Sequence, residues 1–544
     1  MQKPASAPLT RRSGFINTFL GWAILGGLVL YLLLFTFNSL TRVLPFAPDS
    51  MNYVDVARNI AAGKGISQST LGYNQAHLFD ENSQAPEPLV VQPPLYPLMI
   101  AGTSRLGLSF VASALLIPAI AYAVILLIAF FLARELFGVS TAVLTTAGLL
   151  IFAPLGLFSR KAFSESPTLV FLLLSLLLSI LVRRRIGTAP LGFITFLGGV
   201  AAGLAFATRY AMLLLVLLES FYLVEGFVSK KNKPYALLPY VLGAAIPIGL
   251  VFAHNLISTG RIMPASLPSD RSILYNLSDA FLSMFGTYFW MGSPIVQVIF
   301  AVLLLILSVL LLDKQDMLPK IWHRILHDGY YLLPLWVAGY YFFIVIERSL
   351  ITFNKIDTRL MIPASVVLAI LGIACIVRAF QLISRPVYIR AMATVLILAA
   401  CGQEARFSLS QTAYSLEDRV TASQRLSWIA DNTTDKDFIV GESAMEVPFY
   451  FGRASAFVGP YPLNIYLTYP GLISFADHNC SRYQHIYLIL LPREDIPYDN
   501  LLYRFGQFIT DIRFHQLKDY PRILPVVDLE DGRIFEISCG GISQ

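Results

Sequence analysis

A short polar segment near the start of the chain, residues 48–97, carries the side chains best suited to chemistry. It follows an apolar stretch that ends near Asn38, and residues 50–62 repeat apolar side chains at helical spacing before Gly63. Asp49 is therefore expected at a helix N-terminus beside a lipid bilayer. A carboxylate in that position either caps the helix or serves as a base toward a membrane-bound substrate, and the sequence leaves both alternatives open.

The composition indicates a membrane protein that crosses the bilayer several times. Of 544 residues, 56% are hydrophobic and only 14% are charged, and the mean hydropathy is +0.65. A soluble core of this size could not bury so much apolar surface. The net charge of +6 is spread over loops, which argues against a nucleic-acid partner and favours a role in membrane topology.

The apolar runs predict about eleven transmembrane helices, because a helix satisfies its own backbone hydrogen bonds inside hydrocarbon. The predicted spans are residues 16–38, 111–133, 139–158, 166–182, 190–208, 210–228, 236–256, 294–312, 330–347, 360–377 and 386–402. The first span has a basic flank but no small-residue cleavage site, so we interpret it as a retained signal-anchor.

The distribution of lysine and arginine predicts the orientation in a plasma (inner) membrane. Short loops on one side are rich in basic residues, for example Arg183-Arg184-Arg185 and Lys230-Lys231, whereas the opposite loops hold fewer. Because cytoplasmic loops carry this excess, the N-terminus is predicted to be cytoplasmic. An odd number of spans then brings the loop 39–110, with its amphipathic helices, and the tail after residue 402 to the outer side.

A second domain is predicted from residue 403 to residue 544, where the composition becomes that of a soluble α/β layer. Two helices, two buried strands and a closing hairpin are expected there, at residues 423–431, 500–512, 438–441, 485–491, 526–529 and 533–537. The transmembrane domain accordingly spans residues 1–402. In the tail, Cys480 and Cys539 are candidates for a disulfide, whereas Cys375 and Cys401 fall in predicted spans.

Four short stretches of the membrane part have residue types, and an order along the chain, that are similar to those of a known protein family. They are Asp49-Ser50 with Tyr53, Ala57, Asn59 and Gly63-Lys64-Gly65, closed by Pro93-Pro94-Leu95-Tyr96-Pro97; Ser164-Glu165-Ser166; His254-Asn255 with Gly260 and Pro264; and Asp357-Thr358-Arg359 with Pro363. They resemble the GT-C superfamily of membrane glycosyltransferases, in the branch of lipid A aminoarabinose transferases and protein O-mannosyltransferases. Residues 429–433 and 450–453 also resemble the outer domain common in that group.

The resemblance implies that a hexose or pentose moves from a polyprenyl-phosphate-linked donor to a lipid, glycan or protein acceptor at the outer face. An acceptor hydroxyl is a weak nucleophile, so Asp49 is expected to act as general base in a single displacement that inverts the anomeric centre. The departing phosphate needs cations, and Lys161, Arg209 and Arg359 are the candidates on that rim.

Two of the charged candidates, Glu165 and Arg359, also have a structural alternative. Glu165, the second expected catalytic residue, opens a span where an acid favours the helix dipole whatever the protein does. Arg359 lies at a membrane boundary, where it could simply extend to the lipid headgroups. Arg209 separates two apolar spans and must find an anionic partner, for which a phosphate is suitable.

The uncharged candidates are expected to line a substrate pocket. His254 and Asn255 either belong to that pocket or only cap their own span or bond to a neighbouring helix. Tyr53 and Tyr96 complete the expected set, although Tyr96 lies in a proline-rich turn where an interfacial scaffold role is the alternative.

No cofactor is required by these residues. A divalent ion held by Asp49, Glu165 and Asp357 is an alternative, but the three carboxylates have no ligand spacing. The family often has two adjacent acidic residues where this chain has Asp49-Ser50, which weakens a metal assignment.

Two other functions compete with sugar transfer. Glu219 lies about ten residues into a predicted span, where an acid is costly unless it is paired or hydrated, and a transporter or flippase would use such a group. A noncatalytic receptor would use the outer domain for binding. Only a transferase releases polyprenyl phosphate from a polyprenyl-phospho-sugar.

Overall fold

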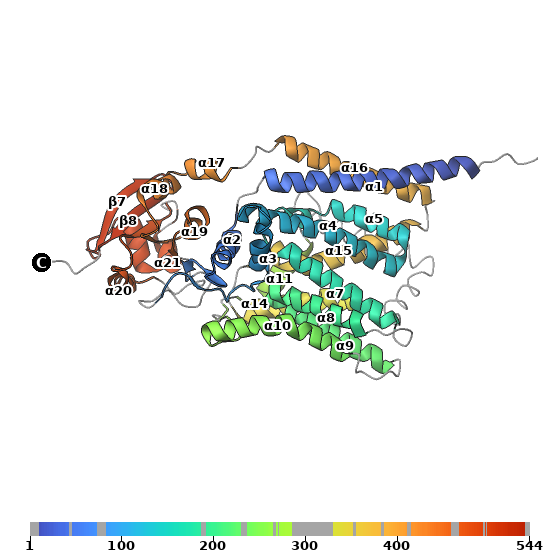
Figure 1. Cartoon of the computed structure of the whole chain (residues 1–544), viewed down its shortest axis with the longest axis horizontal. Coiled ribbons are helices and arrows are strands. Elements are labelled where there is room, and N and C mark those ends of the chain that lie inside the picture. Colours follow the sequence, from blue (N-terminus) through green and yellow to red (C-terminus); the bar gives the residue numbers. More distant parts are fainter. Residues whose placement is uncertain are drawn as a thin grey trace, which may run out of the picture.

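The long helices of the chain lie side by side in a bundle, and a mixed sheet with its own helices adjoins one end of that bundle (Figure 1). The computed structural model describes residues 10–42, 46–72, 83–185, 192–229, 237–264, 268–269, 271–285, 330–351, 355–381, 386–410, 415–458, 467–492, 496 and 498–538. The bundle helices are α1 (Thr10–Thr41), α4 (Phe110–Phe137), α5 (Val139–Leu150), α6 (Ala153–Ser159), α7 (Glu165–Arg185), α8 (Gly192–Thr208), α9 (Leu213–Ser229), α10 (Leu237–Thr259), α14 (Leu332–Leu350), α15 (Thr358–Gln381) and α16 (Pro386–Ser410).

Six helices within the described ranges are long and apolar enough to cross a membrane, and a bent pair, α5 with α6, makes a seventh if it counts as one span. The protein is therefore a multi-pass membrane protein. Helix α8 is apolar but has 17 residues. The span expected at residues 294–312 lies outside the described residues, so the total of about eleven stays a prediction.

Glycines allow helices α8 and α10 to pack with their backbones in contact. A Cβ atom on Gly199 of α8 would lie 1.9 Å from the carbonyl oxygen of Tyr240 on α10, and one on Gly243 would lie 2.2 Å from that of Phe196. Both distances are far below van der Waals contact, so the two backbones touch because neither position has a side chain. Close backbone approach of this kind is a usual source of helix association in lipid.

Short elements gather at the end of the bundle that adjoins the sheet, which we call the α2 end (Figure 1). They are α2 (Pro48–Ala61), β1 (Ser67–Gln68), β2 (Thr70–Leu71), β3 (Glu87–Pro88), α3 (Leu95–Ser104), η1 (Tyr210–Met212) and α11 (Ile273–Phe285). Helix α2 ends as the sequence predicts, because Gly63 adopts a positive φ of 76° that favours glycine.

The C-terminal part forms a sheet with strand order β2-β5-β4-β6-β8-β7. Its elements after the bundle are α17 (Leu416–Thr421), α18 (Gln424–Asn432), β4 (Phe438–Gly441), α19 (Glu446–Phe451), β5 (Ser455–Phe457), α20 (Tyr469–Asn479), β6 (Ile486–Leu490), α21 (Tyr498–Arg513), β7 (Ile523–Leu529) and β8 (Gly532–Ile537). The central strands β4 and β6 are parallel and wholly buried, as expected of strands with helices on both faces. Helices α20 and α21 cover one face, and α18 and α19 cover the other.

One strand of this sheet comes from the loop that follows α2. Strand β2 runs parallel to β5, with Thr70 opposite Ser455 and Leu71 opposite Ala456. The hydroxyls of Thr70 and Ser455 lie 2.9 Å apart and are buried. The polar segment near the start of the chain is therefore built into the C-terminal sheet.

The cysteines divide into two kinds. Cys375 and Cys401 are free thiols, whereas Cys480 is disulfide-bonded. Cys539, its expected partner, lies outside the described residues.

Candidate active site

Arg359 joins the two carboxylates that the sequence singles out. Its Nη1 atom lies 2.5 Å from a carboxylate oxygen of Asp49, and its Nε atom donates to Glu165. Arg209 donates to the same Glu165 oxygen at 2.6 Å. Four charged residues from four different segments of the chain therefore form one continuous ion-pair network at the α2 end.

Helix starts bring three of these residues together. Asp49 is the second residue of α2, Glu165 is the first of α7, and Arg359 is the second of α15. The α15 start is capped by Asp357, whose carboxylate accepts from the Leu360 amide at 3.0 Å. The positive ends of three helix dipoles consequently point toward one small volume, which favours negative charge there.

The Asp49 side chain forms an ion pair and does not cap its helix. The N-cap residue of α2 is Ala47, which precedes the helix, and no side chain caps that helix. The Asp49 carboxylate instead pairs with Arg359 and accepts a hydrogen bond from Gln92 Nε2 at 3.0 Å. Of the two alternatives that the sequence left open, the capping role is therefore the wrong one.

Arg209 occupies a break between helices. Its backbone is extended, with φ −153° and ψ 124°, between the end of α8 and the 3-10 turn η1. This break turns the chain at the bundle rim and frees the guanidinium to reach Glu165. The anionic partner that the sequence demanded for Arg209 is thus a carboxylate of the protein itself.

An aromatic ring supports the cations. The guanidinium of Arg359 lies 4.3 Å from the centroid of the Phe163 ring, and the Lys161 ammonium lies 5.7 Å from the same centroid. Lys161 therefore belongs to the same group. It differs from the two arginines, because none of the carboxylates in the described part of the chain forms an ion pair with it.

The site is buried at its base and open toward Asp49. The Glu165 side chain is fully buried, whereas the side chains of Asp49 and Arg359 are 16% and 20% exposed. A ligand that enters from the exposed side meets Asp49 and Arg359 before Glu165.

The two tyrosines form the wall next to α2. The rings of Tyr53 and Tyr96 pack edge to face with centroids 5.0 Å apart. The Tyr53 hydroxyl lies 3.3 Å from the Ser164 hydroxyl, next to Glu165, and burial raises the pKa of the Tyr53 phenol. The Tyr96 hydroxyl is used elsewhere, since it donates to the Ala114 carbonyl at 2.6 Å. Tyr53 consequently borders the ion-pair network, while Tyr96 supports it.

His254 and Asn255 hold the segment that precedes α3. The Nε2 atom of His254 lies 2.9 Å from the Leu89 carbonyl oxygen. Asn255 donates to the Tyr210 hydroxyl at 3.0 Å, and that hydroxyl donates to the Val90 carbonyl at 2.7 Å. Both side chains therefore anchor backbone next to Gln92, and their place in a substrate pocket stays a prediction.

The carboxylates considered for a divalent ion each bind protein groups in this structure, and the divalent ion stays a prediction. Asp49 and Glu165 bind arginines, and Asp357 caps α15. Over the described ranges, no group of three or more His, Cys, Asp or Glu side chains could hold a metal ion.

Three residues that the sequence did not single out contribute to this region. Gln92 donates a hydrogen bond to Asp49, and the ring of Phe163 packs against the guanidinium of Arg359. Glu347, near the α2 end of α14, acts electrostatically on Arg209. Glu347 could have been identified from the sequence, because it is a carboxylate near the end of an apolar span and next to Arg348. No local sequence feature distinguishes Gln92 or Phe163.

Glu219, from which a transport function was considered, is hydrogen-bonded inside the bundle through Oε2, whereas its buried Oε1 atom has no hydrogen-bond partner among the described residues. Its carboxylate accepts hydrogen bonds from Ser175 at 2.5 Å and from Tyr240 at 2.7 Å. These contacts join α7, α9 and α10, which is a structural use of a buried acid.

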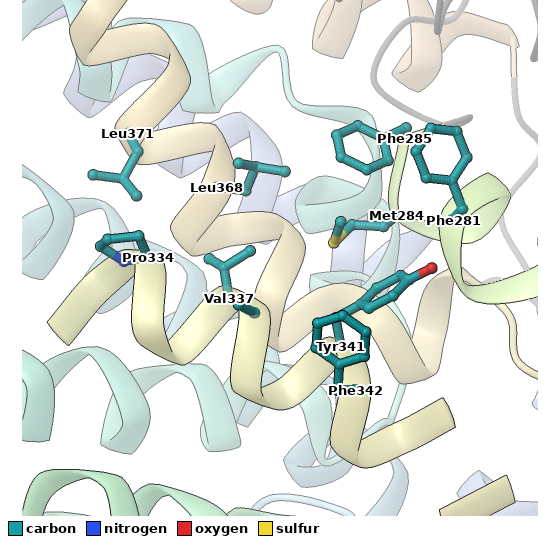
Figure 2. A pocket seen from close by; sticks show the side chains of 10 residues that line it. Phe281, Met284, Phe285, Pro334, Val337, Tyr341, Phe342, Leu368 and Leu371 are labelled. Atoms are coloured by element: carbon teal, nitrogen blue, oxygen red, sulfur yellow. The ribbon is translucent and has the colours of Figure 1, made fainter. Parts of the chain in front are cut away.

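An apolar cavity of about 380 Å³ lies between α11, α14 and α15. Figure 2 shows Phe281 and Met284 on α11, Val337 and Tyr341 on α14, and Leu368 on α15 facing it. The remaining lining residues are Phe285, Pro334, Ala338, Phe342 and Leu371. Leu368 is nine residues beyond Arg359, so the cavity lies about 14 Å along α15 from the ion-pair network.

Comparisons with known proteins agree on one group. Residues 91–252 match the family model described as dolichyl-phosphate-mannose-protein mannosyltransferase. No functionally curated protein sequence matches the chain significantly.

Solved structures share the fold over nearly the whole chain. ArnT from Cupriavidus metallidurans in the apo state is 14% identical, with a TM-score of 0.55 over 98% of this chain and 100% of that one. ArnT bound to undecaprenyl phosphate is 14% identical, with a TM-score of 0.53 over 96% and 99%. The archaeal oligosaccharyltransferase AglB from Archaeoglobus fulgidus, in complex with an inhibitory peptide and a dolichol-phosphate, is 13% identical, with a TM-score of 0.51 over 90% of this chain and 72% of that one.

The family match and the shared multi-pass fold agree with the four sequence stretches that meet, or lie next to, the ion-pair network. Over residues 91–252 the chain is similar to the protein mannosyltransferase family model, and its overall fold is similar to those of ArnT and AglB.

Proposed function

We propose that the protein transfers a sugar from a polyprenyl-phosphate-linked donor to an acceptor hydroxyl at the outer face of the membrane. The observation that carries this proposal is the Asp49–Arg359–Glu165–Arg209 network with Lys161 beside it. A base and several phosphate-binding cations are brought together where three helix N-termini meet.

The cations fit a phosphate that leaves. When the bond between C1 of the sugar and the phosphate oxygen breaks, the electron pair stays on the phosphate, whose charge becomes more negative. Arg359 and Arg209 are already paired with carboxylates, whereas Lys161 has an uncompensated charge within the described residues, so Lys161 can take up the added charge. The relative ArnT was crystallised with undecaprenyl phosphate, which is a leaving group of this type.

Asp49 serves as the general base. The acceptor oxygen attacks C1 from the face opposite the phosphate, its proton passes to the Asp49 carboxylate, and the anomeric centre is inverted in one displacement. Without ligand, Asp49 is held by Arg359 at 2.5 Å, and such an ion pair lowers the basicity of a carboxylate. A donor phosphate competes for the same guanidinium and thereby releases Asp49 for the acceptor.

The apolar cavity accommodates the proximal part of the polyprenyl tail. It is lined almost entirely by carbon and lies about two and a half turns of α15 from Arg359. Helix α11 borders it and is fixed near the start of α15, because Asp279 pairs with Lys355 at 3.2 Å and Ser283 donates to the Ile356 carbonyl at 3.1 Å. A lipid whose phosphate binds Arg359 can therefore lay its tail against this surface.

The test uses purified protein in detergent with a radiolabelled polyprenyl-phospho-sugar and a mixture of lipid and glycan acceptors. We expect release of polyprenyl phosphate with transfer of label to an acceptor. Binding of the donor without any release, for lipid, glycan and peptide acceptors alike, would contradict the proposal.

A further inference from the structure

We infer that the C-terminal sheet domain positions the general base, and that Arg58 is the positioning residue through which it does so. Helix α2 carries Asp49 in its first turn and Arg58 in its last turn. Because this role assumes that Asp49 acts on the acceptor, it rests on the proposed sugar transfer.

Arg58 binds the end of a helix in the sheet domain. Its Nη1 atom donates to the carbonyl oxygens of Pro448 at 2.8 Å and Phe449 at 2.6 Å. Both carbonyls lie in the last turn of α19, where the helix dipole is negative, and the Pro448 carbonyl also accepts from the Gly452 amide at 3.0 Å. The guanidinium thus joins the C-terminal ends of α2 and α19 with two charge-assisted hydrogen bonds.

A second contact holds α2 from the side. The buried Asp55 carboxylate accepts from the Ser69 amide at 2.6 Å and from the Ser69 hydroxyl at 2.8 Å. Ser69 precedes β2, and its carbonyl accepts from the amide of Ser455 in β5. The middle of α2 is in this way connected to the sheet.

Ring packing completes the attachment. The Phe46 ring, which precedes α2, lies 4.8 Å from the Phe449 ring, centroid to centroid. Phe449 is buried, and the Arg58 guanidinium lies 5.8 Å from its centroid. Helix α19 therefore contacts the chain at both ends of α2.

The geometry makes Asp49 sensitive to this attachment. Nine residues separate Asp49 from Arg58, which corresponds to about 14 Å along the helix. A tilt of about 4° at the Arg58 end displaces Asp49 by about 1 Å, and a misplacement of that size lowers a rate by about 100-fold. The donor cations lie on other segments, so donor binding does not depend on α2 in the same way.

The experiment measures kcat, KM and the stoichiometry of donor binding for Arg58→Ala, Arg58→Lys and the control Arg105→Ala. Arg105 is an exposed arginine next to the C-terminal end of α3. For Arg58→Ala we expect kcat to fall 10- to 100-fold while one donor still binds per protein with an affinity within about threefold of wild type. Arg58→Lys should recover part of kcat, and millimolar guanidinium should restore part of the activity of Arg58→Ala.

The outcomes separate the two proposals. If the wild-type protein transfers sugar and Arg58→Ala keeps its kcat, the positioning role is wrong while the function stands. If Arg58→Ala loses donor binding in proportion to activity, Arg58 is merely structural and the inference is again overturned. If the wild-type protein releases no polyprenyl phosphate, the proposed function itself fails.

Discussion

Asp49 and Arg359 form a 2.5 Å ion pair between the first turns of α2 and α15. The pair connects a base candidate to a phosphate-binding candidate, although 310 positions separate them in the sequence. Both side chains are partly exposed, and in the proposed reaction a donor phosphate reaches the guanidinium and replaces the carboxylate. The predictions below start from this exchange.

Removing the base should stop the chemistry and leave the donor site intact. For Asp49→Asn we expect kcat to fall by about 100-fold or more, which corresponds to about 3 kcal/mol of activation free energy. The amide keeps the size of the side chain but cannot accept the proton. Rates are measured as polyprenyl phosphate released, and the donor dissociation constant is measured in parallel. Wild-type rates in this variant would show that another group takes the proton.

Removing Arg359, the cation that bridges Asp49 and Glu165, should weaken the binding of the donor. For Arg359→Ala we expect a donor dissociation constant raised by about 10- to 100-fold, because a hydrogen bond to a charged group contributes about 1.5–3 kcal/mol. Arg359→Lys keeps the positive charge but lacks the second donor nitrogen. Its donor dissociation constant should lie between those of the wild-type protein and Arg359→Ala. The measurement is equilibrium binding of a polyprenyl phosphate. An unchanged dissociation constant in the alanine variant would move the phosphate site elsewhere.

The sequence was sufficient for elements whose signals are local. Residues 50–62 and Gly63 predicted α2, and the apolar run at residues 438–441 coincides with β4. Asp49, Glu165, Arg209 and Arg359 could be selected because charged groups at the edges of apolar spans are rare.

The residues that contact these four could not be predicted from the sequence, because the contacts form only through tertiary packing. Nothing near Arg209 in the chain indicates that Glu165 will meet it, and Gln92 is an ordinary loop residue until it binds Asp49. Strand β2 has two residues, too few for any periodicity, so its place in the C-terminal sheet is visible only in the fold. Asp49 looked like a helix cap for the same reason, since Arg359 is remote in sequence.

The exchange at Arg359 predicts an ordered reaction in which the donor binds first. An acceptor can use Asp49 only after the donor phosphate has taken over the guanidinium. We therefore expect a nonreactive acceptor analogue to inhibit uncompetitively against the donor. The measurement is initial velocity at varied donor and fixed analogue concentrations. Noncompetitive inhibition would mean that acceptor and donor bind independently.

Filling the apolar cavity should affect long donors selectively. Val337→Trp puts a large ring into a space of about 380 Å³ between α11, α14 and α15. We expect the KM for a donor with a long polyprenyl chain to rise about tenfold, while the KM for a short-chain analogue that ends before the cavity stays unchanged. Leu238→Trp, at an exposed position of α10, is the matched control. An equal change for long and short donors would show that the tail lies elsewhere.

Two acids, Asp55 in the middle of α2 and Glu87 in β3, should make the attachment to the sheet domain pH-dependent. Burial raises the pKa of Asp55 to about 6 and that of Glu87 to about 7. Glu87 accepts from Gln68 at 2.6 Å and from the Gly72 amide at 3.2 Å, beside β2. Because both pKa values are higher in the folded protein than in an unfolded chain, the folded protein binds more protons between about pH 4 and pH 7. The free energy of unfolding contributed by these groups therefore decreases as the pH rises through that window and is constant above it. We expect the thermal unfolding midpoint in detergent to fall from pH 4.5 to pH 7. Glu87→Gln should make the midpoint depend less on pH in the upper part of this range.

The control is Glu417→Gln, which changes an exposed carboxylate and should leave the pH dependence of the midpoint unchanged. If the midpoint of Glu87→Gln falls as steeply with pH as that of the wild-type protein, Glu87 is not the source of the pH dependence.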